Sequence, residues 1–195
     1  MRRAMPFALI VVTVLGLGCG PAAVPLRLQT LPDVASARQG AIHGLGRALF
    51  AALREGEPER VLVDDLVLRS LLDSAGASRT NAIRQMAGPG LRASGNALAL
   101  SLRGATYVGV CLQESSVQGP GGALGLGADA WVVERVFLVA QHPRGGRLGG
   151  WGEGSFVFTS HGFGAIALDS AEPLRPAHSD LELASCEMAA GLDDL

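Results

Sequence analysis

The densest group of potentially reactive side chains is an alternating polar run near the end of the sequence. His178, Asp180 and Glu182 are separated by single residues, so on a β-strand all three lie on one face. An imidazole beside two carboxylates is typical of half a metal site or of acid–base chemistry. Leu181 and Leu183, which fall on the other face, explain the same alternation as an edge strand with its charged face in water. We favour this second interpretation and predict no metal ligand or catalytic residue here.

The other candidate motifs lack the spacing that their chemistry requires. His142 and His161 precede His178 at intervals that match no metal-ligand pattern. The glycine-rich stretch 119–129 does not lead from a strand into a helix, as a phosphate-binding loop must. Ser155 stands one position away from the serine of a G-x-S-x-G motif and has no evident base. We therefore predict no cofactor and no catalytic set, and we expect 119–129 to be a flexible hairpin loop.

The first nineteen residues carry the clearest functional signal of the sequence. Two arginines stand near the start, an uncharged apolar run covers 7–17, and Gly18 precedes Cys19. A basic start, a short apolar run and a small-residue exit are typical of an export signal, and such a run is too short for a membrane-spanning helix. The sequence therefore predicts an exported protein with a signal peptide over 1–18.

The segment LGLGC, which ends at Cys19, resembles the lipobox of bacterial lipoproteins, in which a cysteine is linked to diacylglycerol. Gly18 and Cys19 match that pattern, whereas Gly16 and Leu17 depart from it. The resemblance implies a lipidated Cys19 with two or three acyl chains, since a single chain binds a membrane only reversibly. In that family an Asp after the cysteine retains the protein in the inner membrane, so Gly20 implies the outer membrane. The alternative is a plain secretory signal in which Cys19 is incidental.

The number and positions of the cysteines predict a disulfide. The chain has three, and lipidation of Cys19 leaves Cys111 and Cys186 in an oxidising compartment that favours a bond between them. Alternation assigns the core faces of their two strands to aliphatic residues, namely Val108, Val110 and Leu112 in one strand and Leu181 and Leu183 in the other. Both cysteines then fall on the opposite face of one sheet, where they can meet if the strands are neighbours. Two separate buried thiols are the alternative.

The charge and the length of the chain indicate a single domain that does not bind nucleic acid. All sixteen basic residues are arginines, and two lie in the signal, which leaves fourteen basic against 18 acidic residues and a formal charge of −4. The chain has no basic stripe and no interleaving of aromatic with basic residues, so we expect no nucleic-acid partner. The sequence predicts a signal over 1–18, a lipidated cysteine with a proline-rich tether over 19–32, and a single domain over 33–195.

Hydrophobic periodicity predicts helices first and strands afterwards. Apolar spacing and capping residues predict helices over 34–55, from Asp64 or Asp65 to Leu72, and over 78–86, where glycines and Pro89 then interrupt the pattern. Alternating and β-branched residues predict strands over 105–114, 131–141, 155–159, 165–168 and 180–187. The expected fold class is α+β, with N-terminal helices packed on a C-terminal antiparallel meander of four or five strands.

This order of elements is similar to that of NTF2-like cone domains, in which helices pack on a curved sheet around a pocket. That resemblance implies small-molecule binding or, as in some members, isomerase or dehydratase chemistry, with Tyr107, Gln113 or Glu134 lining the pocket. A fold shared with that family does not by itself imply its function. We prefer a second hypothesis, a non-catalytic lipoprotein of the cell envelope that binds a protein partner or supports an assembly, because no catalytic set accompanies the anchor.

Overall fold

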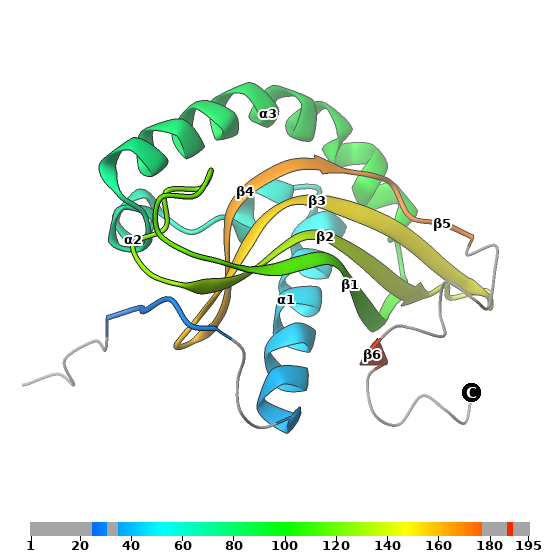
Figure 1. The fold of residues 1–195 in the computed structure, drawn as a ribbon. Helices are drawn as coiled ribbons and strands as arrows, with labels where there is room; N and C mark the ends of the chain where they lie inside the picture. Colours follow the sequence, from blue (N-terminus) through cyan, green and yellow to red (C-terminus); the bar gives the residue numbers. More distant parts are fainter. Residues whose placement is uncertain (1–24, 31–34, 177–186, 189–195) are drawn as a thin grey trace, which may run out of the picture.

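The computed structural model describes residues 25–30, 35–176 and 187–188, which form helices around one antiparallel sheet (Figure 1). The helices are α1 (Ala35–Glu55), η1 (Pro58–Val61), α2 (Asp65–Leu71) and α3 (Ser74–Ser101). The strands are β1 (Thr106–Gln118), β2 (Ala130–Gln141), β3 (Arg147–Thr159), β4 (Gly162–Ala171), β5 (Arg175–Pro176) and β6 (Glu187–Met188). The predicted α+β class is confirmed. None of the helices in these ranges is both long and apolar enough to cross a membrane.

Short carboxylate side chains set where the second and third helices begin. Asp64 accepts a hydrogen bond from the backbone N–H of Val67 at 2.8 Å, and Asp73 accepts one from the N–H of Gly76 at 2.7 Å. Each carboxylate satisfies an amide that has no partner within its helix, as N-capping requires. The helix predicted from Asp64 or Asp65 is therefore confirmed, as is the one predicted over 34–55.

The third helix is longer than its sequence predicts. It runs without interruption from Ser74 to Ser101, through Pro89, whereas we expected a short helix that ended at residue 86. Proline and glycine each disfavour a helix interior, but tertiary packing outweighs them here. Leu91 and Leu98 of this helix are 4 % and 0 % exposed. Burial of such an apolar face supplies most of the stability of a helix in a folded protein.

The four long strands form a meander, and the sheet formed by the described residues has the order β4-β3-β2-β1-β6, with β5 paired to β3. β3 begins at Arg147 rather than at residue 155, so residues 147–154, which lie between two of the expected strands, are also strand. Glycines in this half of β3 make room for close neighbours from other elements. A Cβ at Gly149, for example, would collide with the ring of Phe137. Glycine in a strand often marks such a close approach.

A bulge in β1 corrects the predicted faces of that strand. Tyr107 pairs with Ala140 and Gly109 pairs with Val139, so Val108 is the extra residue. An extra residue reverses the alternation beyond it. Tyr107 and Val110 consequently face the helix α1, and Val108 shares the opposite face with Cys111. The expectation that Val108 and Val110 share a face is wrong.

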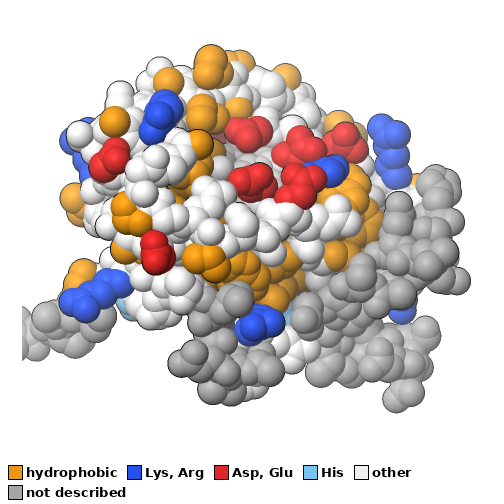
Figure 2. All heavy atoms as spheres, viewed as in Figure 1, with side chains coloured by type: hydrophobic (Ala, Val, Ile, Leu, Met, Phe, Trp, Pro, Cys, Tyr) orange, Lys and Arg blue, Asp and Glu red, His pale blue; other side chains and the backbone are white. Residues whose placement is uncertain are grey.

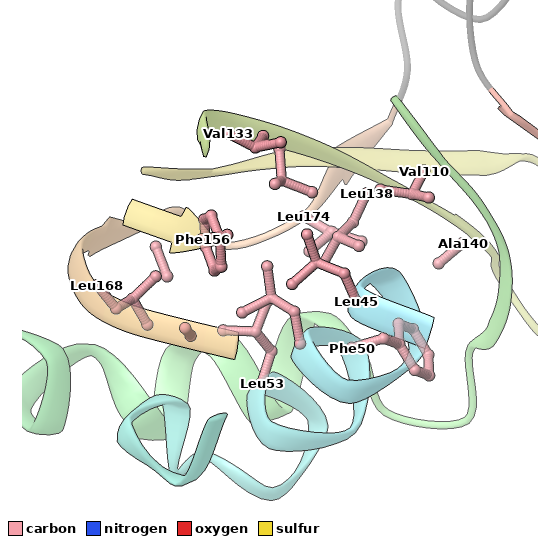
Figure 3. Packing of buried hydrophobic residues seen from close by; sticks show 14 of the residues in the cluster. Leu45, Phe50, Leu53, Val110, Val133, Leu138, Ala140, Phe156, Leu168 and Leu174 are labelled. Carbon is pink, nitrogen blue, oxygen red and sulfur yellow. The ribbon is translucent and has the colours of Figure 1, made fainter. Parts of the chain in front are cut away.

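Helices cover both faces of the sheet. Alternate residues of β2 belong to two different clusters of buried apolar side chains. Trp131 and Val133 belong to the cluster under α1, whereas Ala130 and Val132 belong to the cluster under α2. Side chains of α1 and of the sheet fill the space between them, as Figure 3 shows for residues such as Leu45, Leu53, Leu138 and Phe156. α3 contributes Ala77 to the second cluster and Leu98 to the first. It therefore runs past the edge strand β4, where the Nε of Arg84 donates to the carbonyl of Ile166 at 2.8 Å.

Part of the predicted tether belongs to the folded sheet. The N–H of Gln29 donates to the carbonyl of Phe158 at 2.9 Å, and the carbonyl of Gln29 accepts from the N–H of Trp131 at 2.9 Å. The N–H of Ser160 donates to the carbonyl of Arg27 at 2.8 Å. The chain around Arg27 is therefore fixed to the ends of β2 and β3.

Candidate functional site

Several residues singled out from the sequence lie outside the described residues. These are Cys19, Cys186, His178, Asp180 and Glu182. The lipidation, the disulfide and the interpretation of the alternating polar run therefore stay predictions.

The two described histidines of the hypothetical metal site are far apart. His142 lies in the turn before β3 and His161 in the turn after it, so the thirteen residues of that strand separate them by about 40 Å. Each imidazole contacts its own turn: the Nδ1 of His142 accepts from the N–H of Arg144 at 3.1 Å, and the Nδ1 of His161 lies 3.1 Å from the hydroxyl of Ser160. Among the described residues, no cluster of His, Cys, Asp or Glu could hold a metal ion.

The residues expected to line a cone pocket do not converge. Tyr107 packs between α1 and the sheet, whereas Gln113 and Glu134 are exposed. Glu134 accepts a hydrogen bond from the amide of Gln118 at 3.1 Å. The space that a cone pocket would occupy is filled by the apolar side chains of Figure 3.

The glycine-rich loop is held against the helices, which corrects its prediction as a flexible hairpin. Leu126 within it is 2 % exposed and forms an isolated antiparallel backbone pair with Leu72. The N–H of Gly127 donates to the carbonyl of Leu71 at 3.0 Å, and the N–H of Asp73 donates to the carbonyl of Gly125 at 2.7 Å. These bonds fix the short connection between α2 and α3, and Figure 1 shows the loop beside α2.

The main cavity at this corner is a surface groove of about 670 Å³ between α2 and the first half of α3. We call it the α2–α3 groove. Its lining is formed by Arg69, Leu72, Ser74, Ala77, Ser78, Asn81, Ala82 and Gln85. The polar residues that α3 contributes are spaced by three or four positions, which places them on one face of the helix. Sequence reasoning missed this stripe, although Ser78, Asn81 and Gln85 lie within the helix expected over 78–86.

The groove has hydrogen-bonding capacity and a single charge. Its amides and hydroxyls can both donate and accept hydrogen bonds, and Arg69 is the one ionisable residue in the lining. Arg69 makes no ion pair within the described ranges. Nearby carboxylates are already engaged: Asp65 lies 3.5 Å from Arg84, and Asp73 caps α3. The lining contains no carboxylate, histidine or cysteine.

A second polar network lies on the outer face of the sheet, opposite α1. The guanidinium of Arg135 lies 3.2 Å from Glu114 and 3.3 Å from Glu153, and it stacks over the ring of Trp151 at 4.7 Å. Figure 2 shows several acidic side chains around a basic one on the face in view. Burial, and then the charge of Glu153, raise the pKa of Asp169. Arg135 thus neutralises the carboxylates of two neighbouring strands, which is a structural role.

A hydrogen-bonded aromatic pair joins α1 to β1. The hydroxyl of Tyr107 lies 2.9 Å from the Nδ1 of His43, which is 7 % exposed, and Phe50 packs against the same tyrosine ring. Burial raises the pKa of Tyr107 to about 12, while the positive charge of Arg47 acts in the opposite direction. Removal of the hydroxyl from water is the dominant effect, because burial disfavours the phenolate.

We expect this tyrosine to make the protein less stable in alkali. Between pH 10 and about 12, Tyr107 ionises in the unfolded chain but stays protonated in the folded one, so the free energy of unfolding falls as the pH rises through this range. The test is unusually clean because the chain has one tyrosine and no lysine. Tyrosinate absorbance should report a transition near pH 12 in the folded protein, and Tyr107→Phe should lose this contribution to the alkaline decline. A transition at the ordinary pKa of 10 would contradict the burial of the hydroxyl.

Comparison with known proteins adds no relative. No family model matches the chain, and neither a curated protein nor a solved structure matches it.

Proposed function

We propose that this protein is a lipoprotein of the bacterial cell envelope whose domain is a non-catalytic module that binds a partner protein through the α2–α3 groove. The export signal and the lipobox resemblance support anchoring at Cys19, with Gly20 favouring the outer membrane. The single observation that carries the binding role is the groove itself. It is open and held in place by capped helices, and its lining offers hydrogen bonds beside apolar surface.

The chemistry of the lining supports a polypeptide partner. Protein interfaces combine buried apolar contacts with hydrogen bonds at the rim. Leu72 and Ala77 are 5 % and 7 % exposed at the base of the groove, and Ser78 and Gln85 lie exposed on the same helix face. This arrangement resembles such an interface more than a deep apolar pocket for a small molecule, which encloses most of the surface of its ligand.

Site-specific photocrosslinking in cells tests this role with the full, membrane-anchored chain. A crosslinking amino acid at Ser78 should give one dominant adduct with another protein. The same amino acid at Gln113, an exposed position on β1 outside the groove lining, should not give this adduct. The double substitution Asn81→Ala and Gln85→Ala should reduce the adduct at Ser78, because both amides line the groove. Equal adducts at both positions, or none at Ser78, would overturn the proposal.

A further inference from the structure

We infer that the α2–α3 groove takes an extended acidic segment of its partner, with a partner carboxylate paired to Arg69. This inference rests on the partner-binding role proposed above and adds the chemical class of the bound segment. Three features of the groove carry it: the length of its polar stripe, its unbalanced positive charge, and the small size of its apolar side chains.

The polar stripe has the length and the chemistry to follow a peptide backbone. Ser74, Ser78, Asn81 and Gln85 succeed one another along one face of α3. From Ser74 to Gln85 the helix rises about 16 Å, which equals about five residues of extended chain. Side-chain amides carry a donor and an acceptor together, so Asn81 and Gln85 can each pair with the N–H and C=O groups of an extended peptide.

The charge of the groove and of its helix selects an acidic segment. Arg69 has no counter-ion among the described residues, and the lining contains no carboxylate. Of the three arginines of α3, Arg84 pairs with Asp65 and Arg92 with Glu59, so Arg79 is the one without an ion pair among the described residues. A guanidinium binds a carboxylate through paired, charge-assisted hydrogen bonds. A partner carboxylate would thus give Arg69 the ion pair that this chain does not supply.

The apolar part of the groove favours small side chains. Ala77 and Ala82 line it, and Leu72 is 5 % exposed. Alanine-sized side chains of an extended peptide can pack closely against such a surface. Large rings would meet the backbone of the helix first and would keep the peptide away from the polar stripe.

Binding of two matched peptides to the full-length protein in detergent tests the inference. The first probe is acetyl-Ala-Glu-Ala-Glu-Ala-amide, and the second replaces both glutamates with glutamine. We expect the acidic peptide to bind about tenfold more tightly, as one charge-assisted hydrogen-bonded pair allows. Arg69→Gln should abolish this preference and leave the weaker, neutral binding intact. Arg79→Gln is the matched control, because Arg79 is exposed on α3 but does not line the groove, and it should preserve most of the preference.

The possible failures separate the two proposals. If crosslinking at Ser78 captures a specific partner but the two peptides bind equally, the acidic class is wrong and the partner-binding role stands. The acidic class is also wrong if Arg79→Gln abolishes the preference as fully as Arg69→Gln, because the effect would then come from a general positive field. If inorganic phosphate displaces the acidic peptide at equal concentration, the groove is an anion site and not a peptide site. If neither peptide binds and Ser78 captures no partner, the proposed function fails.

Discussion

Cys186→Ala should lower the free energy of unfolding by about 4 kcal/mol relative to the oxidised parent, the chain-entropy value for a disulfide that closes a loop of about 75 residues. The paired strands support this bond. In the antiparallel register of β1 and β6, Gly109 lies opposite Met188 and Val110 lies opposite Glu187. Cys111 follows Val110, and Cys186 precedes Glu187, so one further step of the same register would place them opposite each other. Residues opposite each other in such a pair have Cα atoms about 4.5 to 5.5 Å apart, within the range that a disulfide needs.

The position of the substitution matters for the interpretation. Cys111 is 4 % exposed among Val108, Phe137 and Val139, so any replacement there also disturbs packing. Cys186→Ala leaves the Cys111 side chain in place and removes only its proposed partner. Cys19→Ala serves as the control, since it should remove acylation without changing the stability of the domain.

Two measurements check the bond. Denaturant unfolding of the parent with and without reductant should show that reduction reproduces the loss caused by Cys186→Ala. Intact mass of protein extracted from the membrane fraction should show a chain that starts at acylated Cys19 and gains two hydrogens on reduction. An unchanged mass, together with an unchanged unfolding midpoint, would establish that Cys111 and Cys186 are not bonded and would favour the alternative of separate thiols.

The sequence predicts the type of most elements because their signals are local. Apolar spacing and an aspartate cap suffice for α2, and β-branched alternation suffices for β2. The missed features depend on distant parts of the chain. α3 continues through Pro89 because leucines beyond it are buried against other elements, and the glycine-rich half of β3 is strand because Phe137 of β2 fills the space over Gly149. No periodicity within the segment itself carries that information.

The candidate site was missed for the same reason. The α2–α3 groove exists because the glycine-rich loop 119–129 fixes the connection between the two helices, at residues 72–73, which lies about fifty residues earlier in the chain. Leu124 and Leu126 were the available signal, since leucines inside a glycine-rich loop indicate that it packs on something. The bulge at Val108 was not predictable, because one inserted residue changes the faces of a strand without changing its composition.

Gly95→Ala should destabilise the protein by about 2 kcal/mol, within the range seen when a packed interior receives an extra carbon. Gly95 is buried where α3 passes the end of α1. Its Cβ would collide with the carbonyl oxygen of Gly56, which ends α1 with a φ of +75°. The atom in the way belongs to the backbone, and this backbone is fixed because the N–H of Gly56 donates to the carbonyl of Leu53 at 3.0 Å. The collision can therefore be relieved only if the two helices move apart.

Gly90→Ala is the matched control within the same helix, and it should have the opposite effect. No atom lies within 4 Å of a Cβ at Gly90, and alanine in an exposed helix interior is favoured over glycine by about 1 kcal/mol. Denaturant unfolding of both variants should therefore differ by about 3 kcal/mol, although the chemical change is identical. A Cβ meets the Gly56 carbonyl at position 95 and open space at position 90. Equal stabilities would therefore mean that α3 does not approach Gly56 and that the long helix, and with it the wall of the groove, is placed differently.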